Sequence, residues 1–574
     1  MRRHLTVSKT ITVSALSLLI GFNSNAQFKA PPLTPATFTQ YKTLSTLQKI
    51  LLKKTILVYI TSILKSPLDT IKTKSIEAEN ILDLSQKNTT TEEKELLTAL
   101  AKLSDEGSLS STIDQIIEQL KTENAMVKQR IQEVTPSELA YAKGMLISSV
   151  EGTLRLRGLT ADSKSNEYLE WSVLSNKMIE KINADQINPD ILSLSKSSWV
   201  NTRAVEILVN GPASFAKREM IMNAASESIN ILTWSIYDDL TGAESVDLLI
   251  GRKKQNPNLK IRVIVDGQVA ATSGHGDQVK RLEDSGIEVI RWFSKTKPFA
   301  GQHRKMIVVD NKQMIAGGLN MGDVYSHKNP DLKIARWRDT DIYVDGSGAA
   351  EGNRLFAQIW NEQVTLRKLP LAKINAPLAI KSTADEKVQI SVINHDVEKS
   401  TQGSTVMLTI LKAIRTAKTQ IDIENAYIIL FPALKSELKK AIDERHVKVR
   451  VFTNSSESVD EPIVSVPILR SVSEFADIGA EVYVKKGATL HSKLVVVDSQ
   501  FTMIMSYNLH PRSERVEGEM AIAIKDTAFA SQVHDVFTQD TTEDKAYRIR
   551  SSLDVKMPSS PASIPTLRLF FDML

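Results

Sequence analysis

An internal repeat is the feature that most constrains how this chain can fold. From about residue 200, short β-branched runs alternate with helical stretches, and the same order of segments occurs twice at an offset of about 190 residues. Ile229–Trp234 corresponds to Ile421–Ala426, and Gly286–Val289 corresponds to Gly479–Val482. Alternating strands and helices are typical of βαβ units, which form largely parallel sheets. We therefore predict an α/β fold in which two homologous domains with mostly parallel sheets pack face to face, preceded by a helical N-terminal region.

The repeat also divides the 574 residues into segments. A chain of this length exceeds a single core and predicts several domains of about 100–200 residues each. The predicted segments are a signal peptide at 1–26, a helical accessory region at 27–195, a first repeated domain at 196–378, a second repeated domain at 379–550 and a flexible C-terminal tail at 551–574. The accessory region has several helix-start signals and few strand-like runs, and no residue pattern in it indicates chemistry.

The N-terminal residues have the pattern of an export signal. Met1–His4 carries positive charge, an apolar run follows from Ile11 to Phe22, and Ser24–Ala26 supplies the small residues of a cleavage site. A short membrane anchor is the alternative, but the apolar run is shorter than the about 20 residues that a spanning helix needs. We expect an exported protein that is periplasmic or secreted, with peripheral contact to a membrane.

Two motif copies at equivalent points of the repeat carry the candidate chemistry. Both fit H-x-K-x4-D, and in both an asparagine follows the histidine by 17 positions. The residues are His303, Lys305, Asp310 and Asn320 in the first copy, and His491, Lys493, Asp498 and Asn508 in the second. A single match would be a weak signal, because short patterns occur by chance in long chains. Two matches in register within a repeat are hard to attribute to accident.

The spacing within each copy assigns different roles to its residues. Residues two apart on an extended chain share a face, so His303 and Lys305 point the same way, as do His491 and Lys493. The aspartates lie an odd number of positions onward and face away from these pairs, which predicts a structural role for Asp310 and Asp498. The apolar residues between them indicate a strand buried on both faces, and the asparagines return beside the His-Lys pairs on a neighbouring strand.

The residue types suit attack on a phosphodiester without a metal. Lysine ammonium groups and asparagine amides can stabilise the negative charge that builds on the phosphoryl oxygens. One histidine can attack phosphorus while the other protonates the leaving alcohol and then deprotonates the acceptor. No metal-ligand spacing accompanies the motifs, and the absence of cysteine excludes zinc-thiolate sites and thiol nucleophiles. We therefore expect neither a metal nor another cofactor.

These segments resemble the paired HKD motifs of the phospholipase D superfamily over roughly residues 200 to 545. The flanks Gly317–Asp323, Trp337–Thr340 and Ser506–Ser513 are similar to those of its bacterial cardiolipin synthase branch. The resemblance implies that two α/β halves meet so that both His-Lys pairs face one cleft. It also implies that Asp339 and Glu519 are the carboxylates that hold the histidine rings. Glu517 departs from the branch, which usually has asparagine at this position.

The resemblance implies a phosphodiesterase or phosphatidyl transferase that acts on phospholipids through a phosphohistidine. The acceptor is water in a phospholipase D and a lipid alcohol in a cardiolipin synthase, and the motifs do not separate the two. An exported endonuclease is the first alternative, but no basic run interleaved with aromatic residues lies beside either motif, so a nucleic-acid partner is not expected. A catalytically inactive lipid-binding protein is the second alternative. The intact His303, Lys305, His491 and Lys493 argue against it. The resemblance favours His303 as nucleophile and His491 as acid.

Overall fold

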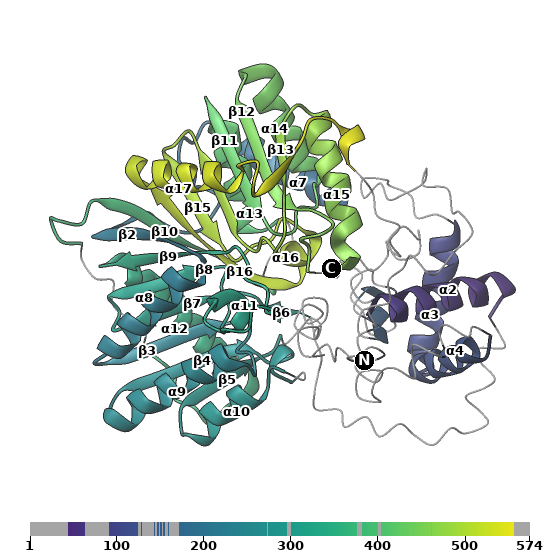
Figure 1. The fold of residues 1–574 in the computed structure, drawn as a ribbon, viewed down its shortest axis with the longest axis horizontal. Helices are drawn as coiled ribbons and strands as arrows, with labels where there is room; N and C mark the ends of the chain where they lie inside the picture. Colours follow the sequence, from purple (N-terminus) through teal and green to yellow (C-terminus); the bar gives the residue numbers. More distant parts are fainter. Residues whose placement is uncertain are drawn as a thin grey trace, which may run out of the picture.

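The computed structural model describes residues 44–63, 91–123, 171–271, 274–294, 300–375, 382–399, 403–460 and 462–555, together with isolated residues between 128 and 159. The expected signal peptide and the end of the expected tail, from residue 556, lie outside the described residues. Figure 1 shows two α/β halves, one above the other, with a layer of N-terminal helices to their right. The expected α/β fold with two sheets is confirmed.

The first half is built on a seven-stranded sheet with the order β2-β9-β8-β7-β3-β4-β5. Its strands are β2 (Ala204–Val209), β3 (Ser228–Thr233), β4 (Lys260–Asp266), β5 (Glu288–Trp292), β7 (Met306–Val309), β8 (Gln313–Gly317) and β9 (Thr340–Asp345). The helices of this half are α8 (Asn210–Ala224), α9 (Leu240–Gln255), α10 (Asp277–Asp284), α11 (Asp323–Ser326) and α12 (Gly348–Arg367), with a 3-10 turn η6 (Val269–Ala271).

The second half contains a ten-stranded sheet in which the central order is β10-β16-β15-β14-β11-β12-β13. These strands are β10 (Val388–His395), β11 (Gln420–Asn425), β12 (Lys448–Asn454), β13 (Glu481–Lys485), β14 (Lys493–Val497), β15 (Phe501–Met505) and β16 (Glu517–Lys525). The sheet is extended by β1 (Val200–Thr202), β17 (Ala546–Ile549) and β6 (Gly301–Gln302). The helices are α13 (Thr405–Thr416), α14 (Pro432–Arg445), α15 (Pro462–Asp477), α16 (Pro511–Arg515) and α17 (Thr527–Asp540), followed by the 3-10 turn η7 (Ser552–Asp554).

The two sheets repeat one topology, strand for strand. Within the two sets of seven strands that correspond, the described parallel pairs are those of β3-β4-β5 and β11-β12-β13, and the strands that continue each sheet on the β7 and β14 side are antiparallel; the short β6 adds a parallel pair with β16. The sheets are therefore mixed, not mostly parallel. The reason is that β7 and β8, like β14 and β15, are joined by tight turns, and a tight turn can connect only antiparallel strands.

A shared core holds the sheets face to face. Met306 and Val308 from β7 belong to one buried cluster with Leu494 and Val496 from β14. The strand β15 contacts β8 and β9 across this layer. Because β7 and β14 are buried along their whole length, apolar residues do not alternate with polar ones: they fill all of β7 and every position of β14 after Lys493. The packing brings the ends of both motif strands to the junction between the halves.

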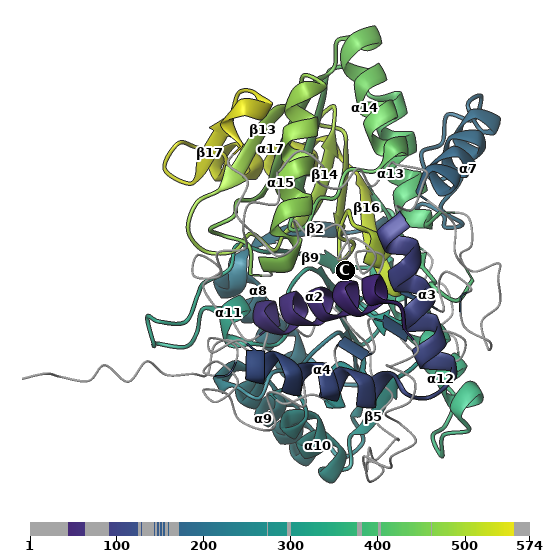
Figure 2. The same ribbon diagram turned by 90° about the vertical axis from the view of Figure 1, so that its right-hand side faces the viewer.

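Three described N-terminal helices, α2 (Thr46–Ile63), α3 (Thr91–Asp105) and α4 (Leu109–Glu123), pack on one another in a layer beside the two halves. A fourth, α7 (Trp171–Ala184), packs on the second half instead. Figure 2 shows α2, α3 and α4 on the side of the molecule where the two halves meet, and α7 contacts α13 and α14 of the second half. Among the described residues, none of the helices combines the length and the apolar character that crossing a membrane requires.

Candidate active site

Each motif enters the junction on a short extended segment that leads into a buried strand. His303 and Lys305 lie between β6 and β7, while His491 and Lys493 lie at the start of β14. All four side chains are at most 2% exposed. The Lys305 Nζ donates to the carbonyl oxygen of His303 at 2.7 Å, and Lys493 Nζ donates to that of His491. Each lysine is thus fixed beside its own histidine, as the spacing of two predicts.

The two pairs form one electrostatic centre. Burial is the main cause that lowers the pKa of His303, and the charges of Lys305, Lys493 and His491 lower it further. Burial likewise lowers the pKa of Lys305 to about 7 and that of Lys493 to about 8. Two ammonium groups that lose their charge this readily are stabilised when an anion binds between them. The centre is therefore suited to a phosphate group.

Each histidine takes its carboxylate partner from the other half of the molecule. Glu519, on β16 of the second half, accepts a hydrogen bond from His303 Nδ1 at 2.9 Å. Asp339, just before β9 of the first half, accepts one from His491 Nδ1 at 2.6 Å. Sequence position alone would place each carboxylate with the histidine of its own half. The structure exchanges them, because the return strand of each half lies nearer to the motif of the opposite half.

Backbone hydrogen bonds fix this exchange. The His303 N–H donates to the Gly518 carbonyl at 2.9 Å, next to Glu519, and β6 pairs with the start of β16. In the other direction the His491 N–H donates to the Arg338 carbonyl at 2.7 Å, next to Asp339. The geometry is therefore reciprocal, and each motif histidine bonds a carboxylate of the opposite half.

The two carboxylates differ in ionisation. Burial raises the pKa of Glu519 to about 7, although Lys305, Ser506 and Ser513 oppose this rise. The pKa of Asp339 stays below its ordinary value, because the His491 ring and Lys493 outweigh the cost of burial. Asp339 is consequently ionised at neutral pH and Glu519 only in part. Of the two rings, His491 has the stronger anchor for a positive charge.

The second ring nitrogens are left for substrate. No described residue makes a hydrogen bond to Nε2 of His303 or of His491, and both atoms are buried. The Asn320 amide donates to the Tyr325 hydroxyl, whose ring lies 5.2 Å from that of His491, while its own oxygen has no partner among the described residues. The Asn508 amide is likewise without a partner there. Buried polar atoms are normally satisfied, so these exceptions mark the position of a ligand.

Aromatic side chains and serine hydroxyls complete the surroundings of the centre. Trp234 lies 6.0 Å from the His303 ring and Trp337 lies 5.4 Å from the His491 ring, measured between centroids. Ser506 and Ser513 donate to the Glu519 carboxylate. Sequence reasoning included Trp337, Ser506 and Ser513 in the flanks that resemble the cardiolipin synthase branch but gave them no role in the site. A further signal for Ser506 is that it occupies, relative to Asn508, the position of Gly318 relative to Asn320.

The motif aspartates lie away from the centre and fasten the hairpins. Asp310 takes φ 51° at the turn after β7, and its carboxylate accepts hydrogen bonds from the backbone of Ser226, Glu227 and Ser228. Asp498 takes φ 54° and does the same for residues 418–420 before β11. Aspartate tolerates the left-handed conformation that such turns need. Its carboxylate also ties the motif strand to its neighbour.

Glu517 lies close to the His303 ring, at 3.9 Å from Nδ1. One ligand-type atom each from His303, Glu517 and Glu519 falls within 4.8 Å of the others, a grouping that could hold a cation. The protein itself supplies partners to both carboxylates, however. Arg512 Nε donates to Glu517 at 2.6 Å, and Ser513 donates to Glu519 at 2.6 Å. The guanidinium already provides the positive charge that a metal would bring.

Comparison with known proteins gives the same family as the motifs. The sequence matches the family described as "Cardiolipin synthase, PLD-like domain" over residues 218–342 and 410–541. Cardiolipin synthase A of Pseudomonas fluorescens Pf-5 is 30% identical over 357 residues, which are 60% of this chain and 70% of the relative. Cardiolipin synthase A of Pseudomonas entomophila L48 is 28% identical over 63% of this chain and 73% of the relative.

Among solved structures, phosphatidylserine synthase of Haemophilus influenzae Rd KW20 superposes with a TM-score of 0.54 at 15% identity. The match covers 67% of this chain and 96% of that chain. At this level of identity the likeness concerns the fold alone.

Proposed function

The chain belongs to the cardiolipin synthase, PLD-like domain family, and from this premise we propose that it transfers the phosphatidyl group of a phospholipid to an alcohol through a covalent phosphohistidine. It is an enzyme of the phospholipase D type that acts on phospholipid phosphodiesters. The observation that carries the finer proposal is the pair of buried histidines, each held through Nδ1 by a carboxylate and each with an unpartnered Nε2.

In the first step the Nε2 lone pair of one histidine attacks phosphorus, and the bond from phosphorus to the leaving alkoxide oxygen breaks. The other histidine, protonated at Nε2, gives that proton to the leaving oxygen. In the second step it takes the proton of the acceptor hydroxyl, whose oxygen attacks phosphorus and releases the first histidine. Lys305, Lys493 and the two asparagine amides stabilise the phosphoryl oxygens in both steps.

His303 is the proposed nucleophile and His491 the proposed acid. An acid must carry a proton before the leaving group departs; burial lowers the pKa of His491 to about 4, and the ionised Asp339 opposes this fall. Glu519, with its pKa raised to about 7, favours charge at His303 less. A neutral imidazole is the form that can attack phosphorus. The ionisation of the two carboxylates thus supports the roles that the family resemblance implies.

We further propose that the reaction needs no metal. The two lysines provide the positive charge at the phosphate, and Arg512 with the serine hydroxyls satisfies the carboxylates that could otherwise hold a cation. Turnover should therefore be unchanged after treatment with EDTA. Loss of activity in EDTA, restored by a divalent cation, would show that the grouping of His303, Glu517 and Glu519 holds a required metal.

An alcohol is the favoured acceptor over bulk water. The histidines and their carboxylate partners are fully buried, and aromatic rings line the centre. A site that excludes water protects the phosphoenzyme from hydrolysis until a hydroxyl held by the enzyme arrives. The N-terminal pattern supports action outside the cytoplasm, with peripheral contact to the membrane that supplies the substrate.

The test is to incubate the purified protein with labelled phosphatidylglycerol, with and without added glycerol, and to separate the lipid products. Cardiolipin formation by the parent and none by His303→Ala or His491→Ala is the expected result. Phosphatidic acid as the dominant product would indicate that the acceptor is water and that the enzyme hydrolyses the phospholipid. Release of nucleotides from DNA, with neither lipid product, would contradict the proposal and indicate a nuclease.

A further inference from the structure

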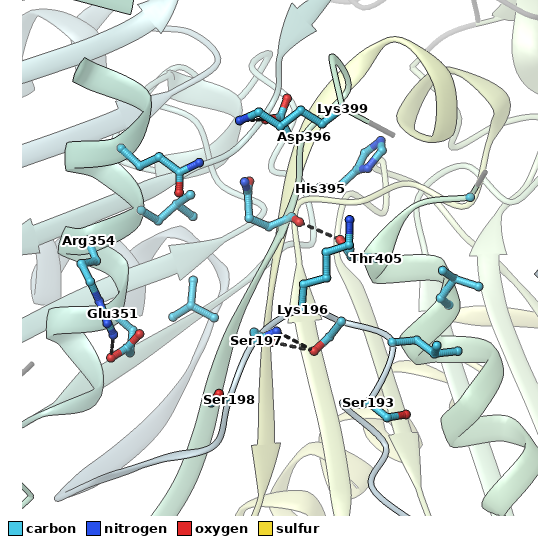
Figure 3. Close-up of a pocket in the computed structure, with 18 of the residues that line it drawn as sticks. Ser193, Lys196, Ser197, Ser198, Glu351, Arg354, His395, Asp396, Lys399 and Thr405 are labelled. Atoms are coloured by element: carbon cyan, nitrogen blue, oxygen red, sulfur yellow. Dashed lines mark hydrogen bonds and ion pairs between the residues drawn. The ribbon is translucent and has the colours of Figure 1, made fainter. Parts of the chain in front are cut away.

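A large cavity lies outside the catalytic centre, where three parts of the chain meet. It has a volume of about 1480 Å³. Its walls come from the segment that follows α7, from α12 of the first half, and from β10 and α13 of the second half (Figure 3). Ligand sites often lie at such junctions, because a ligand there contacts elements that can move relative to one another.

The charges on the cavity wall do not cancel. Arg354 is paired with Glu351, and Lys399 is paired with Asp396 at 2.7 Å, as Figure 3 shows. A third acid of the wall, Asp185, is bound by Lys412 from α13. Each acidic residue of the wall therefore already has a cation of its own.

Two lysines of the same wall remain without a carboxylate partner among the described residues. They are Lys181, half-buried near the end of α7, and Lys196, whose side chain extends into the open centre of the cavity (Figure 3). Burial and the nearby Lys196 charge lower the pKa of Lys181, while the charge of Glu514, which forms no ion pair with it, raises that pKa. Lys196 also takes φ 58°, a left-handed conformation that is costly for lysine. A bound anion would relieve the repulsion between the ammonium groups.

The remaining lining suits an amphiphilic phosphate ester. Ser197 and Ser198 follow Lys196 and bring hydroxyl groups to the wall, while Leu194, Val392 and Leu408 add apolar surface. Lysine binds phosphate as a point charge, and hydroxyl groups donate to its oxygens. The volume exceeds what a single inorganic ion needs and is larger than the about 300–1,000 Å³ of pockets that hold drug-sized ligands, so an amphiphilic ester fits within it.

The cavity wall is connected to the catalytic centre through Arg304, which lies between His303 and Lys305 in the chain. Its Nε donates to the Asn394 side chain at 2.7 Å, and its Nη2 donates to the His395 carbonyl at 2.7 Å. Asn394 and His395 both line the cavity, and His395 pairs in register with Glu519 on the adjacent strand. An occupant of the cavity therefore contacts residues that are bonded to the segment and the strand that carry His303 and Glu519.

We propose that this cavity is a second, non-catalytic site that binds the glycerophosphate group of an anionic phospholipid or of a free glycerol phosphate. The occupied site stabilises the arrangement of the two halves in which the catalytic pairs are complete. The choice of glycerophosphate among phosphate esters rests on the proposed function, whereas the presence of an anion site rests on the cavity and its unpaired lysines.

The experiment measures binding without turnover. The full-length protein with His303→Ala is titrated by calorimetry with dihexanoyl phosphatidylglycerol in one arm and with glycerol 3-phosphate in the other. The same titrations are made after adding Lys181→Gln and Lys196→Gln. The matched control adds Lys254→Gln and Lys260→Gln, which remove the same charge from exposed positions of the first half.

The protein with His303→Ala alone, here called the parent, should show two binding events with the lipid. One of these events should be lost or weakened about tenfold or more in the cavity variant and retained in the control. Saturating ligand should also raise the Tm of the parent more than that of the cavity variant. Binding in the lipid arm alone identifies a phospholipid, and equal binding in both arms identifies the soluble ester. Identical isotherms for the parent and the cavity variant, or no binding beyond a single event, would refute the second site. Because this experiment does not measure turnover, failure of the proposed function is detected separately, in the product assay of the protein without substitutions.

Discussion

The hydrogen bond between Asp339 of the first half and His491 of the second half gives the sharpest test of the catalytic geometry. The Nδ1 to Oδ2 distance is 2.6 Å, and both side chains are fully buried. Asp339→Asn keeps the size of the side chain and removes its charge. A hydrogen bond to a charged group contributes about 1.5–3 kcal/mol, and each 1.36 kcal/mol corresponds to a factor of ten in rate. We therefore expect kcat to fall about 10- to 150-fold.

The leaving group distinguishes the role of the pair. If His491 is the acid, a phosphodiester with a p-nitrophenyl leaving group needs little protonation, so Asp339→Asn should be impaired much less with it than with phosphatidylglycerol. Steady-state kcat for both substrates measures this difference. Asp345→Asn is the matched control, since Asp345 ends the same strand at the surface, where it pairs with Arg203.

Three results would contradict this reasoning. Equal losses with both substrates would mean that Asp339 does not act through the leaving-group step. A loss below about threefold would mean that the buried hydrogen bond contributes far less than charged hydrogen bonds usually do. The loss of kcat could also depend on the leaving group in Glu519→Gln and not in Asp339→Asn. That result would make His303 the acid and His491 the nucleophile.

Three further predictions follow from the ionisation and the turns. Glu519 has a pKa of about 7, so it is mostly neutral at pH 6 and mostly ionised at pH 8. Glutamine mimics only the neutral form. The ratio of kcat for the unsubstituted protein to kcat for Glu519→Gln should therefore increase from pH 6 to pH 8. Lys305 and Lys493 have pKa values of about 7 and about 8 and lose their charge as pH rises, so KM for a phospholipid should increase above pH 8, and a KM that is constant to pH 9.5 would contradict the assigned charges. Asp310→Ala removes hydrogen bonds to the backbone of residues 226–228 and should lower the free energy of unfolding by about 2–3 kcal/mol in denaturant titrations, with kcat unchanged.

The sequence predicted the local geometry of the motifs better than the strand directions. The spacing of His303 and Lys305 determines that both face the same side of an extended chain, and this relation depends only on local geometry. Asp310 could be assigned a structural role for the same reason. Strand direction depends on the connections between strands, and the short turns at Asp310 and Asp498 impose antiparallel pairing that the βαβ texture does not indicate.

The exchange of carboxylates could not be predicted from the sequence. Asp339 follows His303 along the chain, and Glu519 follows His491, so each half looks complete when it is read alone. The partner of each ring is decided by how the halves pack, through the bonds from the His303 N–H to Gly518 and from the His491 N–H to Arg338. These are contacts between residues more than 150 positions apart, and no local pattern specifies them.

Glu517 shows how packing can change the meaning of a single residue. From the sequence it is a departure from the asparagine that the cardiolipin synthase branch usually has. In the structure its carboxylate pairs with the buried Arg512 and lies near the His303 ring. Replacing only Glu517 by asparagine would break a buried ion pair with the Arg512 guanidinium, and such a change is strongly destabilising. The two residues are therefore best understood as a unit. A glutamate at this position places additional negative charge beside His303 and is balanced by a cation that the protein itself supplies.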